Sequence, residues 1–232
     1  MNIVYSLTHH VYQWILPSLR SLAEHNPEAK VYILAEDDKL PFDLPMAAKV
    51  INISGQKWFP KIGVNYNNDF TYINLLKVRY PSILKVQKVI HLDIDTIVCD
   101  SLDGLWETDL TGKWFGAVPE KQTWYRPFGD TYYNMGIAVI NLEQMRKDNI
   151  EPMMEGYLNV VKQPFADQDA WNKYGIACGT AVAIDNRWNE GAPTGRTDNP
   201  AIIHYCGVKD WYTNATMKRV EYLDKYREAE AK

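Results

Sequence analysis

Residues 88–103 read KVIHLDIDTIVCDSLD, and the rest of the chain is organised around this stretch. Its first part, KVIHL, is rich in apolar residues and predicts a β-strand that runs into two carboxylates, Asp93 and Asp95. Alternation along a strand would point both carboxylates to the same side. Two like charges held so close repel each other and raise each other's pKa unless a cation lies between them. The stretch therefore predicts a functional site, either a metal-binding pair or an acid/base couple.

The segments on either side predict an α/β fold. Strand-like and helix-like patterns alternate along the chain, which is typical of a doubly wound, mostly parallel sheet flanked by helices. Ligands of such sheets bind at the carboxyl ends of the strands, where Asp93 and Asp95 fall. We expect a single domain over residues 1–232 with an amphipathic C-terminal helix at residues 214–231. Further strands are expected at 2–7, 30–35, 49–54, 114–118, 136–141, 180–184 and 201–206, and further helices at 12–25, 70–84, 142–147 and 150–161, with Pro81 bending or breaking the second helix.

Composition narrows the classes of function. The 232 residues are 46% apolar and 12% aromatic, which is enough for the core of one large domain. The net charge is −4 and the basic residues are scattered, so we expect no nucleic-acid partner. Three widely separated cysteines argue against a disulfide framework. Because there is no signal-peptide pattern and no apolar run of membrane-spanning length, we expect a cytoplasmic protein without a membrane span, and peripheral contact with a membrane stays open.

A D-x-D sequence after an apolar strand has more than one interpretation. The two carboxylates could cap a loop or pair with lysine. The string LDIDTIV also fits the opening motif of haloacid-dehalogenase-like phosphatases, in which Asp93 would be the nucleophile and Asp95 an acid/base. That motif usually lies on the first strand of its fold, whereas here residues 1–87 already carry a well-formed α/β pattern. Position therefore argues against the phosphatase, which remains an alternative.

Four motifs occur in order along the chain. They are Asp93-Ile94-Asp95, YNMG at 133–136 leading to VINL at 139–142, Asp167-Gln168-Asp169, and HYCG at 204–207 followed by Lys209 and Trp211. In this order and near this spacing they resemble glycosyltransferase family 8, which includes glycogenin and the bacterial lipopolysaccharide galactosyltransferases and glucosyltransferases. The resemblance covers the chain from the first strand to Trp211. It implies a GT-A (Rossmann-like) fold, a UDP-sugar donor, Mn²⁺ or Mg²⁺, and transfer with retention of anomeric configuration.

The resemblance assigns roles in metal binding and catalysis. Asp93, Asp95 and His204 match the family's metal ligands, and two carboxylates with one imidazole suit Mn²⁺, to which a diphosphate adds ligands. Taken alone, a histidine at the end of a strand is more often structural. Asp167 and Gln168 match an Asp-Gln pair beside the donor sugar, with Gln168 stabilising positive charge near the anomeric carbon or acting as a weak nucleophile. On residue pattern alone, Asp167 would be a helix N-cap.

The resemblance also implies a surface that binds the donor. Asn134 and Gly136 match an Asn-small-Gly signature, with Met135 a bulkier residue that would narrow the sugar pocket. Lys77 matches a basic residue that reaches the donor, and its alternative is a solvated helix face. The other residues that the match implies are Ser6, Thr8 and Tyr12 near the uracil, Ile94 between the aspartates, and Gly207 and Lys209 near the diphosphate.

Together, these features predict a metal-dependent, retaining glycosyltransferase that moves a hexose, glucose or galactose, from a UDP-sugar. The acceptor could be a glycan, a lipid-linked molecule or a protein, and the aromatic loop residues Trp124, Tyr125 and Tyr132 are candidate platforms for an acceptor sugar. The alternatives are the phosphatase and a nucleotide-sugar-binding protein that has lost transfer activity. Both aspartates, His204 and the Asp167-Gln168 pair are present, and this favours the active enzyme.

Overall fold

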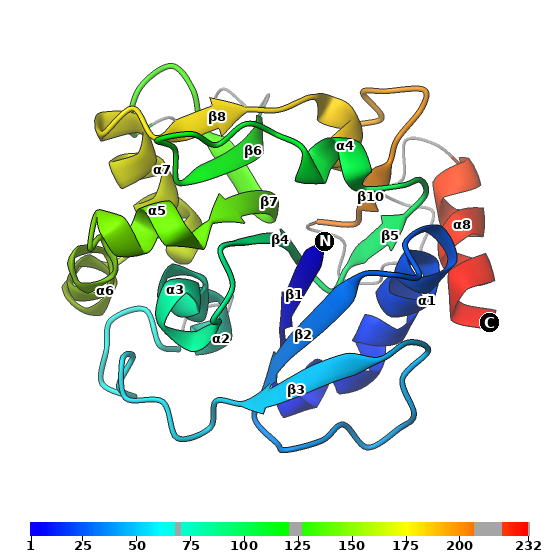
Figure 1. Ribbon diagram of the computed structural model, residues 1–232, viewed down its shortest axis with the longest axis horizontal. Helices are drawn as coiled ribbons and strands as arrows, with labels where there is room; N and C mark the ends of the chain where they lie inside the picture. The colour runs from blue at the N-terminus through cyan, green and yellow to red at the C-terminus, as the bar shows by residue number, and fades with distance from the viewer. Residues whose placement is uncertain (68–70, 121–126, 207–219, 232) are drawn as a thin grey trace.

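The fold centres on a seven-stranded sheet in the order β3-β2-β1-β4-β7-β6-β8 (Figure 1). It is seen in a computed structural model that describes residues 1–67, 71–120, 127–206 and 220–231. Strands β3, β2, β1 and β4 run parallel, β7 lies antiparallel between β4 and β6, and β8 is parallel to β6. The predicted mostly parallel sheet is therefore confirmed. The strands are β1 (Asn2–Ser6), β2 (Lys30–Ala35), β3 (Ala48–Asn52), β4 (Lys88–Leu92), β6 (Phe115–Pro119), β7 (Tyr133–Asn141) and β8 (Ala181–Ala183).

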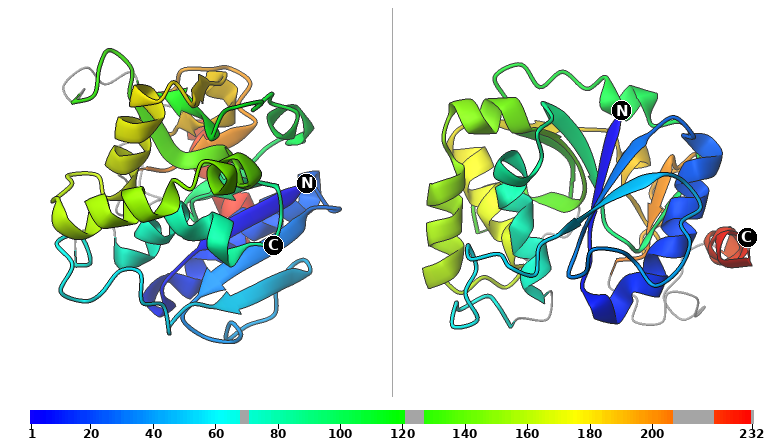
Figure 2. Two further views of the ribbon diagram at one scale, coloured as in Figure 1. Left: turned by 60° about the vertical axis from the view of Figure 1, so that its left-hand side comes forward. Right: turned by 60° about the horizontal axis from the view of Figure 1, so that its bottom comes forward.

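Helices cover both faces of this sheet, because its central strands are buried on both sides. One face carries α1 (Ile15–His25), which continues the 3₁₀ segment η1 (His9–Trp14), and α4 (Asp103–Trp106). The opposite face carries α2 (Thr71–Leu75), η2 (Leu76–Arg79), α3 (Tyr80–Ile83), α5 (Leu142–Lys147), α6 (Glu151–Val160) and α7 (Asp167–Ala177). Figure 2 shows the two helical layers with the sheet between them.

The helix predicted at 70–84 is broken into three short pieces, α2, η2 and α3. Pro81 lies in the first turn of α3, where the missing backbone N–H costs no helical hydrogen bond. The tight η2 turn directs Lys77 inward, and Tyr80 begins α3 at the sheet surface. The break therefore places the side chains of Lys77 and Tyr80 against the sheet.

A second, three-stranded sheet in the order β5-β10-β9 stands beside the first. Its strands are β5 (Thr96–Val98), β9 (Glu190–Gly191) and β10 (Ile202–His204), and η3 (Asn186–Trp188) precedes β9. The C-terminal helix α8 (Val220–Ala231) packs on α1 and on β5 (Figure 1), and residues 214–219 of the predicted helix lie outside the described residues. None of the helices in the described ranges combines the length and the apolar character needed to cross a bilayer.

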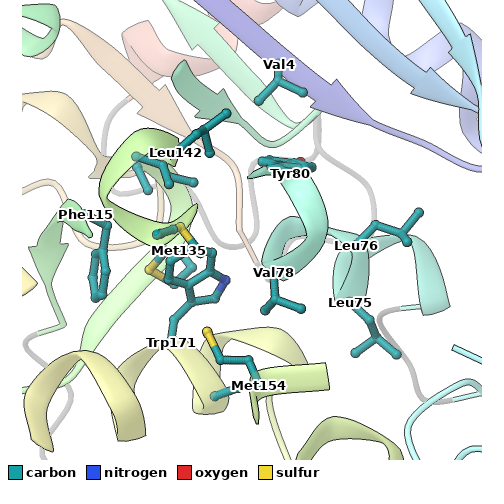
Figure 3. Close-up of a cluster of buried hydrophobic side chains, with 14 of the residues drawn as sticks. Val4, Leu75, Leu76, Val78, Tyr80, Phe115, Met135, Leu142, Met154 and Trp171 are labelled. Atoms are coloured by element: carbon teal, nitrogen blue, oxygen red, sulfur yellow. The ribbon is translucent and has the colours of Figure 1, made fainter. Parts of the chain in front are cut away.

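Two apolar clusters fill the space between the main sheet and its helices. The larger one lies under α2, α3 and α5–α7, and Figure 3 shows part of it, including Trp171, Met135 and Tyr80. The second lies under α1 and α4. Full burial of each large apolar side chain contributes roughly 1.5–3 kcal/mol to folding. The two clusters hold β1 and β4 rigid at the point where the polar residues emerge.

Candidate active site

Asp93 and Asp95 lie in a turn between β4 and β5, at the carboxyl end of β4. The Asp93 backbone N–H donates to the Gly136 carbonyl of β7 at 2.7 Å, and Thr96 Oγ1 donates to the Asp93 carbonyl at 2.8 Å. The two carboxylates do lie together, but strand alternation is not the reason, because both residues lie in a turn. A turn that is fixed by backbone hydrogen bonds brings them together.

His204 ends β10, and the small sheet carries it to the two carboxylates. β10 pairs antiparallel with β5, and the Tyr205 backbone N–H donates to the Asp95 carbonyl at 2.9 Å. His204 Nε2 lies 3.3 Å from Asp95 Oδ1 and 3.9 Å from Asp93 Oδ2. One ligand atom from each of the three residues falls within 4.8 Å of the others. The three predicted metal ligands therefore form one cluster.

The orientation of the His204 ring is set by two asparagines. His204 Nδ1 lies 3.0 Å from Asn189 Oδ1, and Asn189 Nδ2 donates to Asn134 Oδ1 at 2.8 Å. Because a carboxamide oxygen only accepts, Nδ1 carries the proton and Nε2 faces the carboxylates. Asn134 is fixed in turn by Glu120, whose Oε1 accepts from Asn134 Nδ2 at 2.6 Å. An imidazole held in this way presents one nitrogen to a cation.

Gly136 lies against the cluster, where a side chain would not fit. A Cβ on Gly136 would come within 2.2 Å of His204 Cε1 and 2.9 Å of Asp93 Oδ2. Contacts this short require His204 or Asp93 to move. Gly136 is therefore required by the packing of the ligand cluster against β7.

Lys77 is buried between the metal cluster and Asp167. Its Nζ lies 3.3 Å from Asp93 Oδ1 and 3.6 Å from Asp167 Oδ2, and it donates to the Met135 carbonyl at 3.2 Å. Burial disfavours the ammonium, but Asp167 and Asp93 outweigh it and raise the pKa of Lys77. The alternative of a solvated helix face was wrong, because only 3% of Lys77 is exposed.

Burial and neighbouring charges shift the pKa values of Asp93, Asp167 and His204 in different directions. Burial raises the pKa of Asp167 to about 7, although Lys77 opposes the rise. Burial also disfavours the Asp93 carboxylate, yet Lys77 and His91 hold the pKa of Asp93 well below its usual range. For His204, burial opposes the imidazolium, and Asp95 outweighs it and raises the pKa. Three carboxylates, Asp93, Asp95 and Asp167, lie beside the single ammonium of Lys77, and a bound cation would add a further counter-charge.

Asp167 and Gln168 begin α7 and face the strand end of β7. Ala166 occupies the N-cap position of α7 and Asp167 is the first residue of the helix, so the N-cap alternative was wrong. The Asp167 Oδ2 atom is buried and finds no hydrogen-bond donor among the described residues. Gln168 Oε1 accepts from the Met135 backbone N–H at 2.9 Å. This contact holds the Gln168 amide beside the Met135 carbonyl, to which Lys77 donates. Asp167 Oδ2 has the Lys77 ammonium 3.6 Å away but no hydrogen bond within the described part of the chain, which leaves it able to accept one from a bound ligand.

The predicted uracil-binding residues lie at the carboxyl end of β1. Ser6 ends the strand, Thr8 is buried just before η1, and the Tyr12 hydroxyl accepts from the Glu36 backbone N–H at 2.9 Å and donates to Asp37 Oδ2 at 3.0 Å. Glu36 adds a carboxylate that accepts hydrogen bonds from the His9 backbone N–H and the Tyr72 hydroxyl. The described part of this edge is polar and lies between β1 and β2.

The other residues predicted for the site either lie outside the described residues or are buried in the interior. Gly207 and Lys209 lie outside the described residues, as do Trp124 and Tyr125. Tyr132 was wrongly predicted as an acceptor platform, since it is buried and donates to Asp169 Oδ1 at 2.7 Å. The prediction that Met135 narrows a sugar pocket was also wrong, because its side chain is buried in the larger apolar cluster (Figure 3). β-strand alternation turns that side chain into the core while its neighbours face the site.

Three polar residues of the site were not found from the sequence. Asn189 and Glu120 orient His204 through Asn134, and His91 contacts Asp93 Oδ1 through Nε2 at 2.8 Å. Asn189 and Glu120 are in no motif, so no local signal marks them. His91 does carry a signal, since it is a polar residue in the middle of a buried strand.

The chain is similar in sequence to known proteins. Residues 2–215 match the sequence family described as Glycosyl transferase family 8. The chain belongs to glycosyltransferase family 8. A Haemophilus influenzae protein assigned as a glycosyltransferase is 31% identical over 249 residues, which cover 91% of this chain and 73% of that protein. Glycosyltransferase GlyB of Streptococcus pneumoniae is 24% identical, and its match covers 90% of this chain but 57% of GlyB.

Solved structures establish the fold of this family 8 glycosyltransferase. An active-site mutant of LgtC, with glutamine replaced by glutamate, superposes with a TM-score of 0.74 at 21% identity, covering all of this chain and 95% of LgtC. Mouse xyloside xylosyltransferase 1 gives 0.66 at 19% identity, covering 89% of this chain and 98% of that one. The chain has the GT-A fold, as the resemblance implied. Family membership accounts for the D-x-D motif and sets the phosphatase alternative aside.

Proposed function

We propose that the protein is a retaining transferase that moves a hexose, glucose or galactose, from a UDP-sugar with the help of a divalent cation. The observation that carries this proposal is the convergence of Asp93, Asp95 and His204 on one point beside the buried Lys77. In a family 8 chain, this cluster, through the cation that it would hold, and Lys77 can supply the positive charge that a departing diphosphate needs. We take residues 1–232 as a single transferase domain.

The three residues suit Mn²⁺ or Mg²⁺. Carboxylate oxygens and one imidazole nitrogen form a donor set that Mn²⁺ accepts, and Nε2 of His204 is directed at the carboxylates by Asn189. When bound, the cation supplies positive charge to the departing diphosphate. Of the two predicted carboxylate ligands, Asp93 has Oδ1 engaged by Lys77 and His91, so Oδ2 is the oxygen it offers. Ile94, between the two aspartates, is proposed to contact the donor.

Asp167 and Gln168 act on the donor sugar in this proposal. Oδ2 of Asp167, which has the Lys77 ammonium 3.6 Å away but no hydrogen bond from the described residues, accepts one from a sugar hydroxyl. Gln168 lies near the anomeric carbon, and Oε1 already accepts from the Met135 backbone N–H. That hydrogen bond withdraws electron density from a group that is a poor nucleophile in any case. We therefore favour attack by the acceptor from the same face as the departing UDP, with Gln168 stabilising the positive charge on the sugar.

The remaining predicted residues bind the rest of the donor. Lys77 places an ammonium beside Asp93 and Asp167, where it bridges the metal cluster and the sugar-binding carboxylate. Ser6, Thr8 and Tyr12 line the uracil side, and Gly136 and Asn134 support the metal cluster from β7. Gly207 and Lys209 are proposed to contact the diphosphate on the strength of the family motif alone. The acceptor is a glycan, a lipid-linked molecule or a protein.

A donor-hydrolysis screen tests the proposal. Purified protein is incubated with UDP-glucose, UDP-galactose and other UDP-sugars, with and without Mn²⁺, and released UDP is measured. We expect metal-dependent release of UDP from one hexose donor. UDP binding without turnover in the presence of acceptors would indicate a silent binding protein, and absence of both binding and release would refute the proposal.

A further inference from the structure

Asp93 Oδ1 lies close to two hydrogen-bond donors of the protein. Lys77 Nζ lies 3.3 Å away and His91 Nε2 lies 2.8 Å away. The other oxygen, Oδ2, faces His204 and the backbone of Gly136. The carboxylate therefore has one oxygen tied to the protein and one turned toward the cluster.

His91 is the end of a longer hydrogen-bonded chain. Its Nδ1 lies 3.0 Å from the Tyr80 hydroxyl, and that hydroxyl lies 2.6 Å from Ser6 Oγ. All three side chains are buried, with Tyr80 and His91 at most 1% exposed. The chain therefore runs from the end of β1, through the first residue of α3, to the carboxylate at the end of β4.

The direction of the chain follows from its last member. Asp93 is an ionised carboxylate that only accepts, so His91 Nε2 carries a proton and donates. With that proton on Nε2, Nδ1 is the nitrogen that accepts from the Tyr80 hydroxyl, 3.0 Å away. The oxygen of Tyr80 in turn accepts from Ser6. A one-way chain fixes the His91 tautomer and its ring angle together.

The fold explains why these residues meet. β1 and β4 are parallel neighbours with Val4 opposite His91, so Ser6 and His91 point to the same face of the sheet. α3 starts above that face and places the Tyr80 ring on it (Figure 3). Apolar residues at these positions would fill the space without burying hydroxyls and an imidazole, each of which costs about 1–3 kcal/mol if left unpaired. Packing alone does not require the chain.

We propose that Ser6, Tyr80 and His91 are positioning residues that turn Asp93 Oδ2 toward the cation. The proposal rests on the proposed function, because it concerns the metal that the transferase uses. His91 acts through Asp93, and Tyr80 and Ser6 act through His91. None of the three needs to touch the cation or the donor for this role.

The test measures Mn²⁺ binding to the whole chain at saturating UDP, by calorimetry and by electron paramagnetic resonance of free Mn²⁺. His91→Phe should weaken Mn²⁺ binding about 10- to 100-fold, the range typical of residues that orient a ligand. His91→Gln keeps a donor for Asp93 and an acceptor for Tyr80, so it should restore most of the affinity. Tyr80→Phe should weaken binding less than His91→Phe.

Tyr5→Phe is the matched control. Tyr5 also lies on β1 with a buried hydroxyl, but it bonds Ser18 on the opposite face of the sheet. The Tyr5→Phe variant should bind Mn²⁺ with the affinity of the wild type. Wild-type affinity in His91→Phe, or equal losses in Tyr5→Phe and Tyr80→Phe, would overturn the proposal. If His91→Phe does not fold, the comparison of Tyr80→Phe with Tyr5→Phe decides.

Nuclear magnetic resonance of the imidazole nitrogens separates this inference from the proposed function. The wild-type spectrum should show the His91 proton on Nε2, with or without metal. A proton on Nδ1 would refute the chain. If the wild type binds neither Mn²⁺ nor UDP, the proposed function fails and so does the metal role of His91, whereas metal binding with unchanged variants refutes only the positioning role.

Discussion

The two faces of the main sheet hold Asp93 in different ways. On the α2 and α3 side, Lys77 and the chain that ends in His91 hold its carboxylate. On the α1 side, Ser18 bonds Thr96 at 2.9 Å, and Thr96 holds the Asp93 backbone carbonyl. One side thus sets where a reactive oxygen points, and the other sets the path of the main chain. The two sides therefore make different contributions to the same residue.

Both arrangements begin at adjacent residues of β1. Tyr5 and Ser6 point to opposite faces because side chains alternate along a strand. Tyr5 bonds Ser18, and Ser6 bonds Tyr80. The same strand therefore contributes to the fold through one residue and to the site through the next.

Asp95→Asn should give the largest effect, because it removes a charged ligand without changing the shape of the turn. We expect Mn²⁺-dependent UDP binding to be lost and transfer to fall by about 10²–10³-fold or more, the scale on which single electrostatic contacts to a developing charge act. Calorimetry with UDP and Mn²⁺ checks it. Normal metal dependence in this variant would contradict the assigned role of Asp95.

Lys77→Met should affect activity and stability together. It leaves the buried Asp93 and Asp167 without their ammonium, and removal of one partner from a buried ion pair costs about 3–5 kcal/mol. Urea unfolding and UDP release would both be measured. Lys85→Met is the control, because Lys85 is exposed and should change neither. Stability equal to the wild type in Lys77→Met would show that Lys77 is not a structural counter-charge.

Gly136→Ala should act on the cluster more than on the fold. The added Cβ would meet His204, so we expect Mn²⁺ affinity to fall about 10-fold or more as the ring is displaced. Gly156→Ala is the matched control, since nothing lies within 4 Å of its Cβ position in α6. That variant should bind Mn²⁺ normally and gain about 0.5–1 kcal/mol of stability. Equal Mn²⁺ affinity in the two variants would contradict the packing argument.

Ser18→Ala should give the smallest change at the site and test the α1 side of the comparison. It leaves Tyr5 and Thr96 hydroxyls with one partner fewer, so we expect a loss of about 1–3 kcal/mol in unfolding free energy. Mn²⁺ affinity should change little. Thermal unfolding and calorimetry on the same sample measure both. A loss of metal affinity as large as that of His91→Phe would show that the two faces are not separable.

Local sequence patterns predicted the main elements and the motif residues. Apolar alternation marked the strands, the proline at 81 marked the break, and Asp93, Asp95, Asp167 and His204 stood out as motif residues. Local pattern carries this information, because strand and helix periods and turn residues act over a few positions. The motifs also led to the family that residues 2–215 match.

Only the tertiary structure decided which side chains meet. The small sheet brings His204 to Asp95, and Asn189 sets its ring, although no short motif contains both residues. The structure also turned Met135 and Tyr132 into the interior and buried Lys77 between two carboxylates. Burial and partners depend on elements far apart in the chain, and these are set by packing between layers. The site is thus marked by its sequence and assembled by its fold.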